Sequence, residues 1–360
     1  MSDTVAVARS GRFRSIAPYA PASIWVSLLI LGSVMQSVGR GELTLPMVSG
    51  LALATALQIG AALAFCQFLQ ATLHARRVAL LAAFAVTLLA PFVIPADGRT
   101  LRFITACASV VMVMKLWDLY THVRTEAAID PSRLRPFLFN AFSVVLRKQD
   151  EEARPARRRV LVDLVWGVIG SLLGLVAVFT LPLIAWSEYP LLFEHTVKAL
   201  VVFMAILAWF RMVIALVRLM GGRMRDFSGA PLLAVTPADF WRRYNRVFQQ
   251  YFYENVFKRA GGRRSPAAVT ILIFALSAAM HEYVFGIAIG RVQGFQTAFF
   301  LVQGIAVAAT LRIKPKGRLA VASWTTATLV FNLFTSILFF LSFHAIARLY
   351  VNPLPAWLQR

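Results

Sequence analysis

Residues 267–290 read AAVTILIFALSAAMHEYVFGIAIG, and this stretch decides the fold class. Within it, only His281 and Glu282 carry an imidazole or a charge. A helix of these 24 residues rises about 36 Å, which exceeds the roughly 30 Å hydrocarbon core of a bilayer. We therefore interpret the stretch as a membrane-spanning helix.

Apolar runs of similar length recur along the rest of the chain. Together with 267–290 they predict an all-α polytopic membrane protein with about nine transmembrane helices. The second run is long enough to tilt or to contain a break at Pro46. No internal repeat of the kind that many transporters show is visible. The other eight runs are 21–38, 43–70, 78–96, 101–123, 160–186, 196–220, 296–312 and 323–347.

The composition agrees with this interpretation. Of the 360 residues, 59% are apolar and 15% are charged, and the mean hydropathy is +0.69. Soluble domains have about 45–50% apolar and about 25% charged residues, and disordered chains are less apolar still. Cys66 and Cys107 both fall in apolar runs, so the sequence shows neither a disulfide framework nor a cysteine metal site.

Basic residues are distributed unevenly between the loops. The chain has 37 Lys and Arg against 16 Asp and Glu, a net charge of +21. With the N-terminus inside, 27 of the basic residues fall in inside segments and 6 in outside segments, as the positive-inside rule requires. This predicts a cytoplasmic N-terminus and an outer C-terminus. Because every inside loop carries basic residues, they do not form one nucleic-acid-binding face, and we expect no nucleic-acid partner.

The same distribution gives the domain organisation. Residues 21–350 form one transmembrane domain between a cytoplasmic tail, 1–20, and a C-terminal tail, 351–360. We interpret 1–20 as a tail because it has no cleavable small-residue site. Two long cytoplasmic segments, 124–159 and 221–266, interrupt the domain. The first is Arg-rich and contains the apolar stretch Phe137–Leu146, and we expect it to be a connector with a surface helix.

Residues 236–257 read TPADFWRRYNRVFQQYFYENVF and predict one helix beside the membrane. Thr236 suits the N-cap, Pro237 the first helical position and Asp239 a capping box. One interpretation is an interfacial helix whose basic residues meet lipid headgroups, and the other is a helix at the entrance of a site for an anionic, nucleotide-like ligand. The pattern alone does not separate the two. Phe240, Trp241, Tyr244, Phe248, Tyr251 and Phe252 repeat at helical spacing, with Arg242, Arg243, Arg246, Gln249 and Gln250 opposite and Asn245 at the edge.

His281 is expected to lie roughly 20 Å into its helix from the cytoplasmic side. A His-Glu pair at that depth needs protein or a water-filled cavity around it. It is either a polar contact between helices or a general base in a sheltered chamber. His344, in the last apolar run, is the other histidine that could act as the general base. Lys115 and Asp118 lie three residues apart, a spacing at which they could pair on one helix face.

Two segments together resemble a known family. Phe240-Trp241-Arg-Arg-Tyr244-Asn245 is followed, 36 residues after Asn245, by His281-Glu282-Tyr283. This arrangement resembles the membrane-bound O-acyltransferase (MBOAT) superfamily, and more narrowly its diacylglycerol, sterol and wax-ester acyltransferase branch. Two shorter stretches resemble that branch as well, namely Val113-Met114-Lys115-Leu116 with Tyr120, and Val302-Gln303-Gly304-Ile305-Ala306-Val307.

The resemblance implies a buried reaction chamber and roles for individual residues. It implies that His281 is the catalytic base, that Asn245 assists it, and that Gln303 lines the chamber near the thioester. We expect acyl-CoA as co-substrate, no bound cofactor and no metal, and a lipid acceptor such as a long-chain alcohol, diacylglycerol or sterol. Further candidate substrate-binding residues are Glu282, Trp241, Tyr244, Arg242, Arg243 and Arg246.

Several alternatives remain open at this stage. The alginate-type MBOAT branch acetylates glycans and has a histidine where Asn245 stands, but Gly261-Gly262-Arg263-Arg264 is similar to its glycine-basic stretch. Residues 224–229 keep little of the neutral-lipid branch's acyl-CoA motif. A transporter is a third interpretation, and a homodimer is open. The short N-terminal tail favours a bacterial inner membrane over the endoplasmic reticulum.

Overall fold

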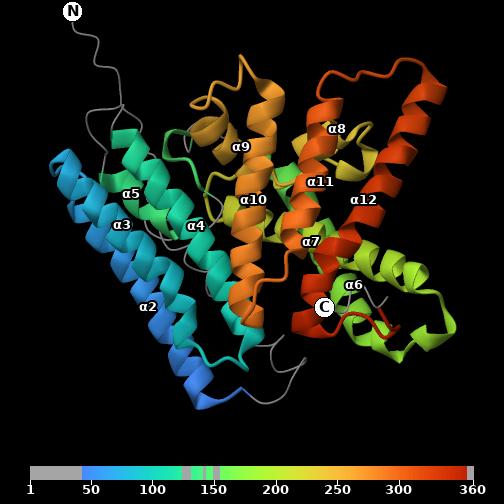
Figure 1. Ribbon diagram of the computed structural model, residues 1–360, viewed down its shortest axis with the longest axis horizontal. Helices are drawn as coiled ribbons and strands as arrows, with labels where there is room; N and C mark the ends of the chain where they lie inside the picture. Colours follow the sequence, from blue (N-terminus) through green and yellow to red (C-terminus); the bar gives the residue numbers. More distant parts are fainter. Residues whose placement is uncertain (1–42, 124–130, 141–142, 149–154, 355–360) are drawn as a thin grey trace, which may run out of the picture.

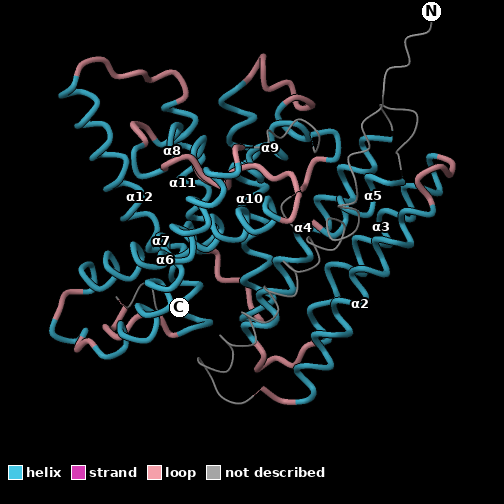
Figure 2. Tube along the Cα trace, turned by 180° about the vertical axis from the view of Figure 1, so that it is seen from behind, coloured by secondary structure: helices cyan, strands magenta, loops and turns pink. Residues whose placement is uncertain are grey.

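The computed structural model describes residues 43–123, 131–140, 143–148 and 155–354. Every regular element in these ranges is a helix, as Figure 2 shows. The expected all-α membrane fold is therefore confirmed. The longer helices are α2 (Leu45–Gln67), α3 (Leu73–Leu89), α4 (Arg99–Val123), α6 (Arg157–Thr180), α7 (Leu191–Leu219), α10 (Pro266–Ile289), α11 (Phe295–Thr310) and α12 (Arg318–Ala347).

Seven helices in the described part of the chain are long and apolar enough to cross a membrane. The exception among the eight longer helices is α11, which has only 16 residues. Each predicted run from 43–70 onward falls on a helix, whereas 21–38 lies outside the described residues. Pro46 does not break α2, because it stands in the first turn, where its missing N–H is not needed.

The helices form a bundle around α4 and α10, which pack antiparallel against each other (Figure 1). Helices α2 and α3 cover one side of α4, and α11 and α12 follow α10 on the other side. Four short elements, α5 (Pro131–Phe139), α8 (Pro237–Arg243), α9 (Arg246–Phe252) and the π-helix η6 (Tyr253–Phe257), belong to the predicted cytoplasmic segments. They gather at the upper end of the bundle in Figure 1.

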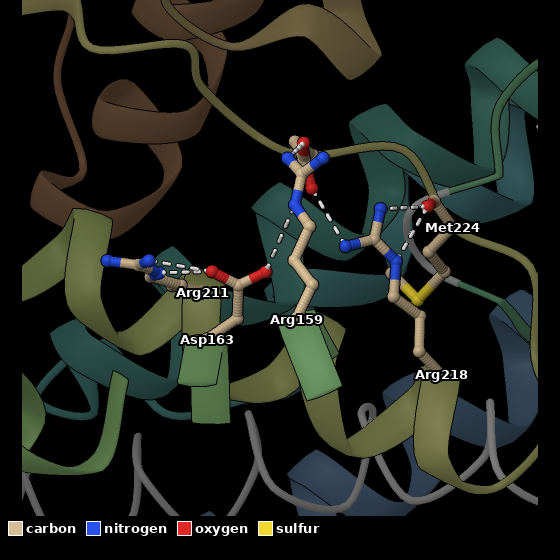
Figure 3. A network of polar contacts seen from close by, with 6 residues as sticks. Arg159, Asp163, Arg211, Arg218 and Met224 are labelled. Atoms are coloured by element: carbon tan, nitrogen blue, oxygen red, sulfur yellow. Dashed lines mark hydrogen bonds and ion pairs between the residues drawn. The ribbon is translucent and has the colours of Figure 1, made fainter. Parts of the chain in front are cut away.

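Helices α6 and α7 form a hairpin at the edge of the bundle. Gly167, Gly170 and Gly174 of α6 lie directly against α7, where an added Cβ would come within 2.5–2.6 Å of the neighbouring helix. Small residues let two helices approach closely in a membrane, where no hydrophobic driving force exists between them. Asp163 near one end of the hairpin binds Arg211 at 2.6 Å (Figure 3).

The described residues after α5 turn toward the inside of the bundle. Helix α5 ends at Phe139, and Val144, Val145 and Leu146 are buried in irregular backbone and a short 3₁₀ turn. The segment turns inward because its apolar side chains enter two core clusters beside α4 and α10. Irregular backbone at such a place needs hydrogen-bond partners, which helix α4 supplies.

Lys115 and Asp118 of α4 are those partners. The Lys115 Nζ atom donates to the carbonyl oxygens of Phe137, Asn140 and Ser143 at 2.5, 2.7 and 2.6 Å. Asp118 Oδ2 accepts a bond from the Leu146 N–H at 2.8 Å. The predicted pairing of Lys115 with Asp118 is therefore wrong. Each side chain instead binds backbone groups of the inward-turning segment.

The predicted topology can be checked by cysteine labelling. We expect Arg263→Cys, in the segment 221–266, to react with a reagent from the cytoplasm, and Arg360→Cys to react only from outside, because the basic residues favour that orientation. The background variant replaces Cys66 and Cys107 with Ala. Labelling of both positions from the same side would show that the chain crosses the membrane an even number of times between them.

Candidate active site

The predicted helix over 236–257 is interrupted at Asn245. Helix α8 ends at Arg243 and α9 begins at Arg246, and Asn245 has a left-handed backbone with φ of +48°. Asparagine tolerates this conformation better than most residues, and its Oδ1 then accepts a bond from Phe248 N at 3.4 Å. One continuous helix was therefore the wrong prediction.

The preceding loop binds the backbone groups that this interruption exposes. The Gly229 N–H donates to the Arg243 carbonyl, and the Arg246 N–H donates to the Phe227 carbonyl, both at 2.8 Å. Sequence periodicity cannot detect such a partner. The beginning of α8 does follow the sequence, because Thr236 Oγ1 accepts a bond from Asp239 N at 3.1 Å.

Trp241 and Gln303 connect three helices. The Trp241 Nε1–H on α8 donates to Gln303 Oε1 on α11 at 2.8 Å. The Gln303 amide nitrogen in turn donates to Thr335 Oγ1 at 2.8 Å and to Asn332 Oδ1 at 3.2 Å, both on α12. Gln303 is 1% exposed, so its amide is fully used inside the protein. Its Oε1 atom is the acceptor for the Trp241 ring N–H.

His281 lies among aromatic rings. Its imidazole centroid is 4.2 Å from that of Phe300 on α11 and 6.0 Å from that of Phe339 on α12. Nδ1 is 2.8 Å from the Ser277 carbonyl oxygen. Because a carbonyl only accepts, Nδ1 must carry the proton, and the neutral ring then has an unprotonated Nε2. No described residue forms a hydrogen bond with Nε2.

Glu282, the residue after His281, binds the start of α11 and not the imidazole. Glu282 Oε1 accepts bonds from the N–H groups of Gln293 and Gly294 at 2.9 and 2.7 Å. Its Oε2 accepts bonds from the N–H and hydroxyl of Thr297 at 3.1 Å. The carboxylate thus caps the N-terminus of α11, where the helix dipole favours a negative charge. It fixes the helix that carries Phe300.

Trp241, Gln303 and His281 therefore gather around Phe300, whose ring lies 6.0 Å from the Trp241 ring. Asn245 makes no hydrogen bond with any of them. Its Nδ2 group donates to no described residue. The sequence does not single out Phe300 and Phe339, because an aromatic residue in an apolar helix gives no indication of the neighbour that it faces.

Tyr244 lies beside Trp241, with the two ring centroids 5.9 Å apart. It stacks on Phe203 of α7 at 5.6 Å and on Phe240 at 5.7 Å. Burial raises the pKa of the Tyr244 hydroxyl to about 12, so this residue stays neutral. It packs α8 on α7.

The three arginines of this region have different surroundings. Arg243 Nε binds Asp239 Oδ2 at 2.9 Å, and the Arg246 guanidinium fills the space that a Cβ on Gly229 would need. The Arg242 side chain is 61% exposed and reaches Asp239 only at 3.7 Å. Burial would raise the pKa of Asp239, but the bond from Arg243 and both arginine charges hold it below its ordinary value. Arg242 is therefore the arginine best placed to meet a ligand.

The competing histidine has a structural partner. His344 Nδ1 accepts a bond from the Tyr350 backbone N–H at 3.0 Å. The adjoining residues Val351 and Asn352 donate to the buried Glu194 carboxylate at the start of α7. The first residues of the predicted C-terminal tail are thus fastened to the bundle, and His344 helps to hold them. Among the described residues, no three His, Cys, Asp or Glu side chains could together hold a metal ion.

Comparison with known proteins identifies the family of the chain. The comparison with curated proteins gave no match. Residues 133–344 match the MBOAT, membrane-bound O-acyltransferase family, and this range covers more than half of the chain. The range begins within α5 and ends in the last turn of α12, and it includes α8, α10 with His281, and α11. The chain is an integral, multi-pass enzyme that belongs to the membrane-bound O-acyltransferase family.

Proposed function

We propose that this chain transfers an acyl group from acyl-CoA to the hydroxyl group of a lipid, with His281 as the general base. The observation that carries the proposal is the Nδ1–H bond to the Ser277 carbonyl. It fixes the tautomer and leaves Nε2 able to accept a proton. The same role would be closed to a histidine whose two nitrogens both had protein partners, as those of His195 do.

The reaction then proceeds in two stages. Nε2 accepts the proton of the acceptor hydroxyl group while the hydroxyl oxygen attacks the carbonyl carbon of the thioester. The carbon–sulfur bond breaks as the ester forms, and the imidazolium returns its proton to the CoA sulfur. The Nδ2–H group of Asn245 supplies a hydrogen bond to the substrate, because it is not committed to a described residue. Gln303 acts through the Trp241 ring as a positioning residue.

The surroundings of the imidazole favour an apolar acceptor. Phe300, Phe339 and Trp241 form aromatic contacts around it. A polyol would bury extra hydroxyl groups without partners there, at about 1–3 kcal/mol each. A long-chain alcohol, diacylglycerol or sterol has one hydroxyl group that needs a partner and can arrive from the bilayer.

An acceptor panel tests this assignment. Purified protein with labelled acyl-CoA is given a long-chain alcohol, diacylglycerol, a sterol and a glycan, and the products are separated by thin-layer chromatography. We expect labelled lipid ester with at least one lipid acceptor. Acylation of the glycan alone would contradict the acceptor class and favour the second MBOAT branch that the 261–264 stretch resembles. Transport of a substrate without any ester product would contradict acyl transfer itself.

The exposed side chain of Arg242 leads to a separate prediction. We expect Arg242→Gln to raise the KM for acyl-CoA severalfold and to change kcat less, since an exposed arginine binds phosphate but takes no part in bond making. The matched control is Lys316→Gln, which removes an exposed basic residue from another loop. An unchanged KM in the Arg242 variant would assign this side chain to lipid headgroups.

A further inference from the structure

Four side chains of α12 form one stripe, because successive members are three or four residues apart and so lie on one face of the helix. The members are Thr328, Asn332, Thr335 and Phe339. At one end, the Thr328 hydroxyl donates to the Val235 carbonyl just before α8 at 3.0 Å. At the other end, the Phe339 ring lies 6.0 Å from the His281 ring. The stripe therefore runs from the predicted cytoplasmic segment 221–266 to the candidate base.

The neighbours of Asn332 fix the orientation of its side-chain amide. An indole N–H only donates, so the Gln303 atom that meets Trp241 at 2.8 Å is the amide oxygen. The Gln303 nitrogen can then only donate, and the Asn332 atom that meets it at 3.2 Å must be an oxygen as well. The remaining atom of the Asn332 amide is thus the nitrogen, Nδ2, with two N–H groups to donate.

The Asn332 Nδ2 atom is buried and forms no hydrogen bond with any residue that the structure describes. The Thr335 hydroxyl, one turn away, accepts a bond from Gln303 Nε2 and donates to the Phe331 carbonyl, both at 2.8 Å. Buried amide N–H groups are nearly always paired, because an unpaired donor in apolar surroundings is costly. The position therefore suits a ligand that brings an acceptor oxygen.

Asn332 lies between α8 and the level of the imidazole. It precedes Phe339 by seven residues, which is a rise of about 10 Å along α12 toward the α8 end. Its neighbour Gln303 follows Phe300 by three residues on α11, a rise of about 4.5 Å toward the same end. Because Phe300 and Phe339 both contact the His281 ring, the Asn332 amide lies roughly 5–10 Å from the level of that ring.

The thiol arm of coenzyme A, pantetheine, carries acceptor oxygens at such distances from its sulfur. Its two amide carbonyls follow the sulfur at about 5 and about 10 Å in an extended chain. An amide carbonyl only accepts hydrogen bonds, as the free Nδ2 group requires. Pantetheine has no charge, so it can enter the apolar layer while the phosphates of coenzyme A stay at the surface.

We propose that Asn332 binds the acyl donor, with its Nδ2–H group donating to an amide carbonyl of the pantetheine arm. This inference rests on the proposed function, because a thioester held at Nε2 of His281 is what brings the arm beside α12. The bond places the thioester in register with the imidazole and does not involve the reacting atoms. A hydrogen bond between uncharged groups changes affinity by roughly 2–10-fold, so its loss is measurable.

The test compares two donors with the same acyl chain on the purified full-length protein. One is the lauroyl thioester of pantetheine, and the other is the lauroyl thioester of ethanethiol, which has no amide. We expect Asn332→Leu to lower kcat/KM for the pantetheine donor by up to about tenfold, mostly through KM, and for the ethanethiol donor by less than about twofold. Leucine has nearly the shape of asparagine but donates no hydrogen bond. An equal loss with both donors would overturn the assignment.

Thr335→Val is the matched control. It removes the other acceptor of the Gln303 nitrogen and leaves the Asn332 amide in place. We expect the ratio of kcat/KM for the two donors to stay at the wild-type value in this variant. If the ratio falls equally in both variants, the Gln303 network as a whole selects the donor, and Asn332 does not bind it.

A thioether analogue separates this inference from the proposed function. S-dodecylpantetheine keeps both amides but has no thioester, and a ligand that binds the folded state raises the melting temperature. In Asn332→Leu, the concentration for the half-maximal shift should increase by up to about tenfold. That result without any ester product from acyl-CoA would contradict acyl transfer and support the pantetheine contact. Ester formation by the wild type with an unchanged donor ratio in Asn332→Leu would contradict the contact alone.

Discussion

His281→Gln should lower the rate of ester formation by at least about 100-fold while the protein still folds and enters the membrane. General-base catalysis contributes about 10²–10⁴-fold, and a glutamine amide cannot accept the proton of an alcohol at neutral pH. The measurement is single-turnover ester formation with labelled acyl-CoA, with the melting temperature recorded beside it. A melting temperature near that of the wild type shows that the loss concerns chemistry and not folding.

Ser277→Ala is the matched control for this experiment. The Nδ1–H of His281 donates to the Ser277 backbone carbonyl, which alanine keeps. We therefore expect this variant to retain most of its activity although it changes the residue that contacts the base. If His281→Gln keeps more than about a tenth of the wild-type rate, Nε2 is not the general base.

Lys115→Met should destabilise the protein by about 3 kcal/mol, at about 1 kcal/mol for each backbone carbonyl left without a donor. The Lys115 side chain is fully buried and binds three carbonyls of the inward-turning segment. Methionine fills a similar volume but donates no hydrogen bond. The expected result is a clear fall in melting temperature and in the yield of folded protein after detergent extraction.

Lys316→Met serves as the control, because Lys316 is exposed in the loop before α12. It loses the same charge without leaving buried carbonyls unpaired. An unchanged melting temperature in Lys115→Met would mean that the segment 137–146 finds other donors, and that the lysine does not hold it in place.

The sequence predicted the helices well where burial in lipid is the only requirement. Each predicted run from 43 onward falls on a helix, because a helix satisfies its own backbone hydrogen bonds in an apolar medium. The errors fall in the two segments outside the bilayer. Asn245 interrupts the helix that the hydrophobic periodicity of 236–257 predicts to be continuous. The loop residues 227–229, which bind the exposed backbone groups at the interruption, lie outside that periodic stretch.

In the candidate site, too, the sequence predicted some features and not others. The His281-Glu282-Tyr283 triplet stood out because titratable groups are rare in spanning helices. The partners of the three side chains could not be predicted from the sequence. His281 faces α11 and α12, Glu282 binds the N-terminus of α11, and the Tyr283 hydroxyl donates to the Leu88 carbonyl on α3. Which polar group meets which partner depends on how helices pack, and one sequence does not contain that information.

The shortness of α11 changes the distance that a polar substrate must travel. Its 16 residues rise about 24 Å, less than the roughly 30 Å hydrocarbon core. Ten residues separate Phe300 from Thr310, where Ala238 N of α8 binds the Thr310 hydroxyl, and these rise about 15 Å. Along α10, the fifteen residues from Pro266 to His281 rise about 22 Å. The permeation barrier for a charged headgroup grows with the thickness of the apolar layer that it must cross. A membrane whose apolar layer matches the length of α11 is therefore thinner beside α11, and we expect a polar group that approaches the imidazole on that side to cross less apolar material.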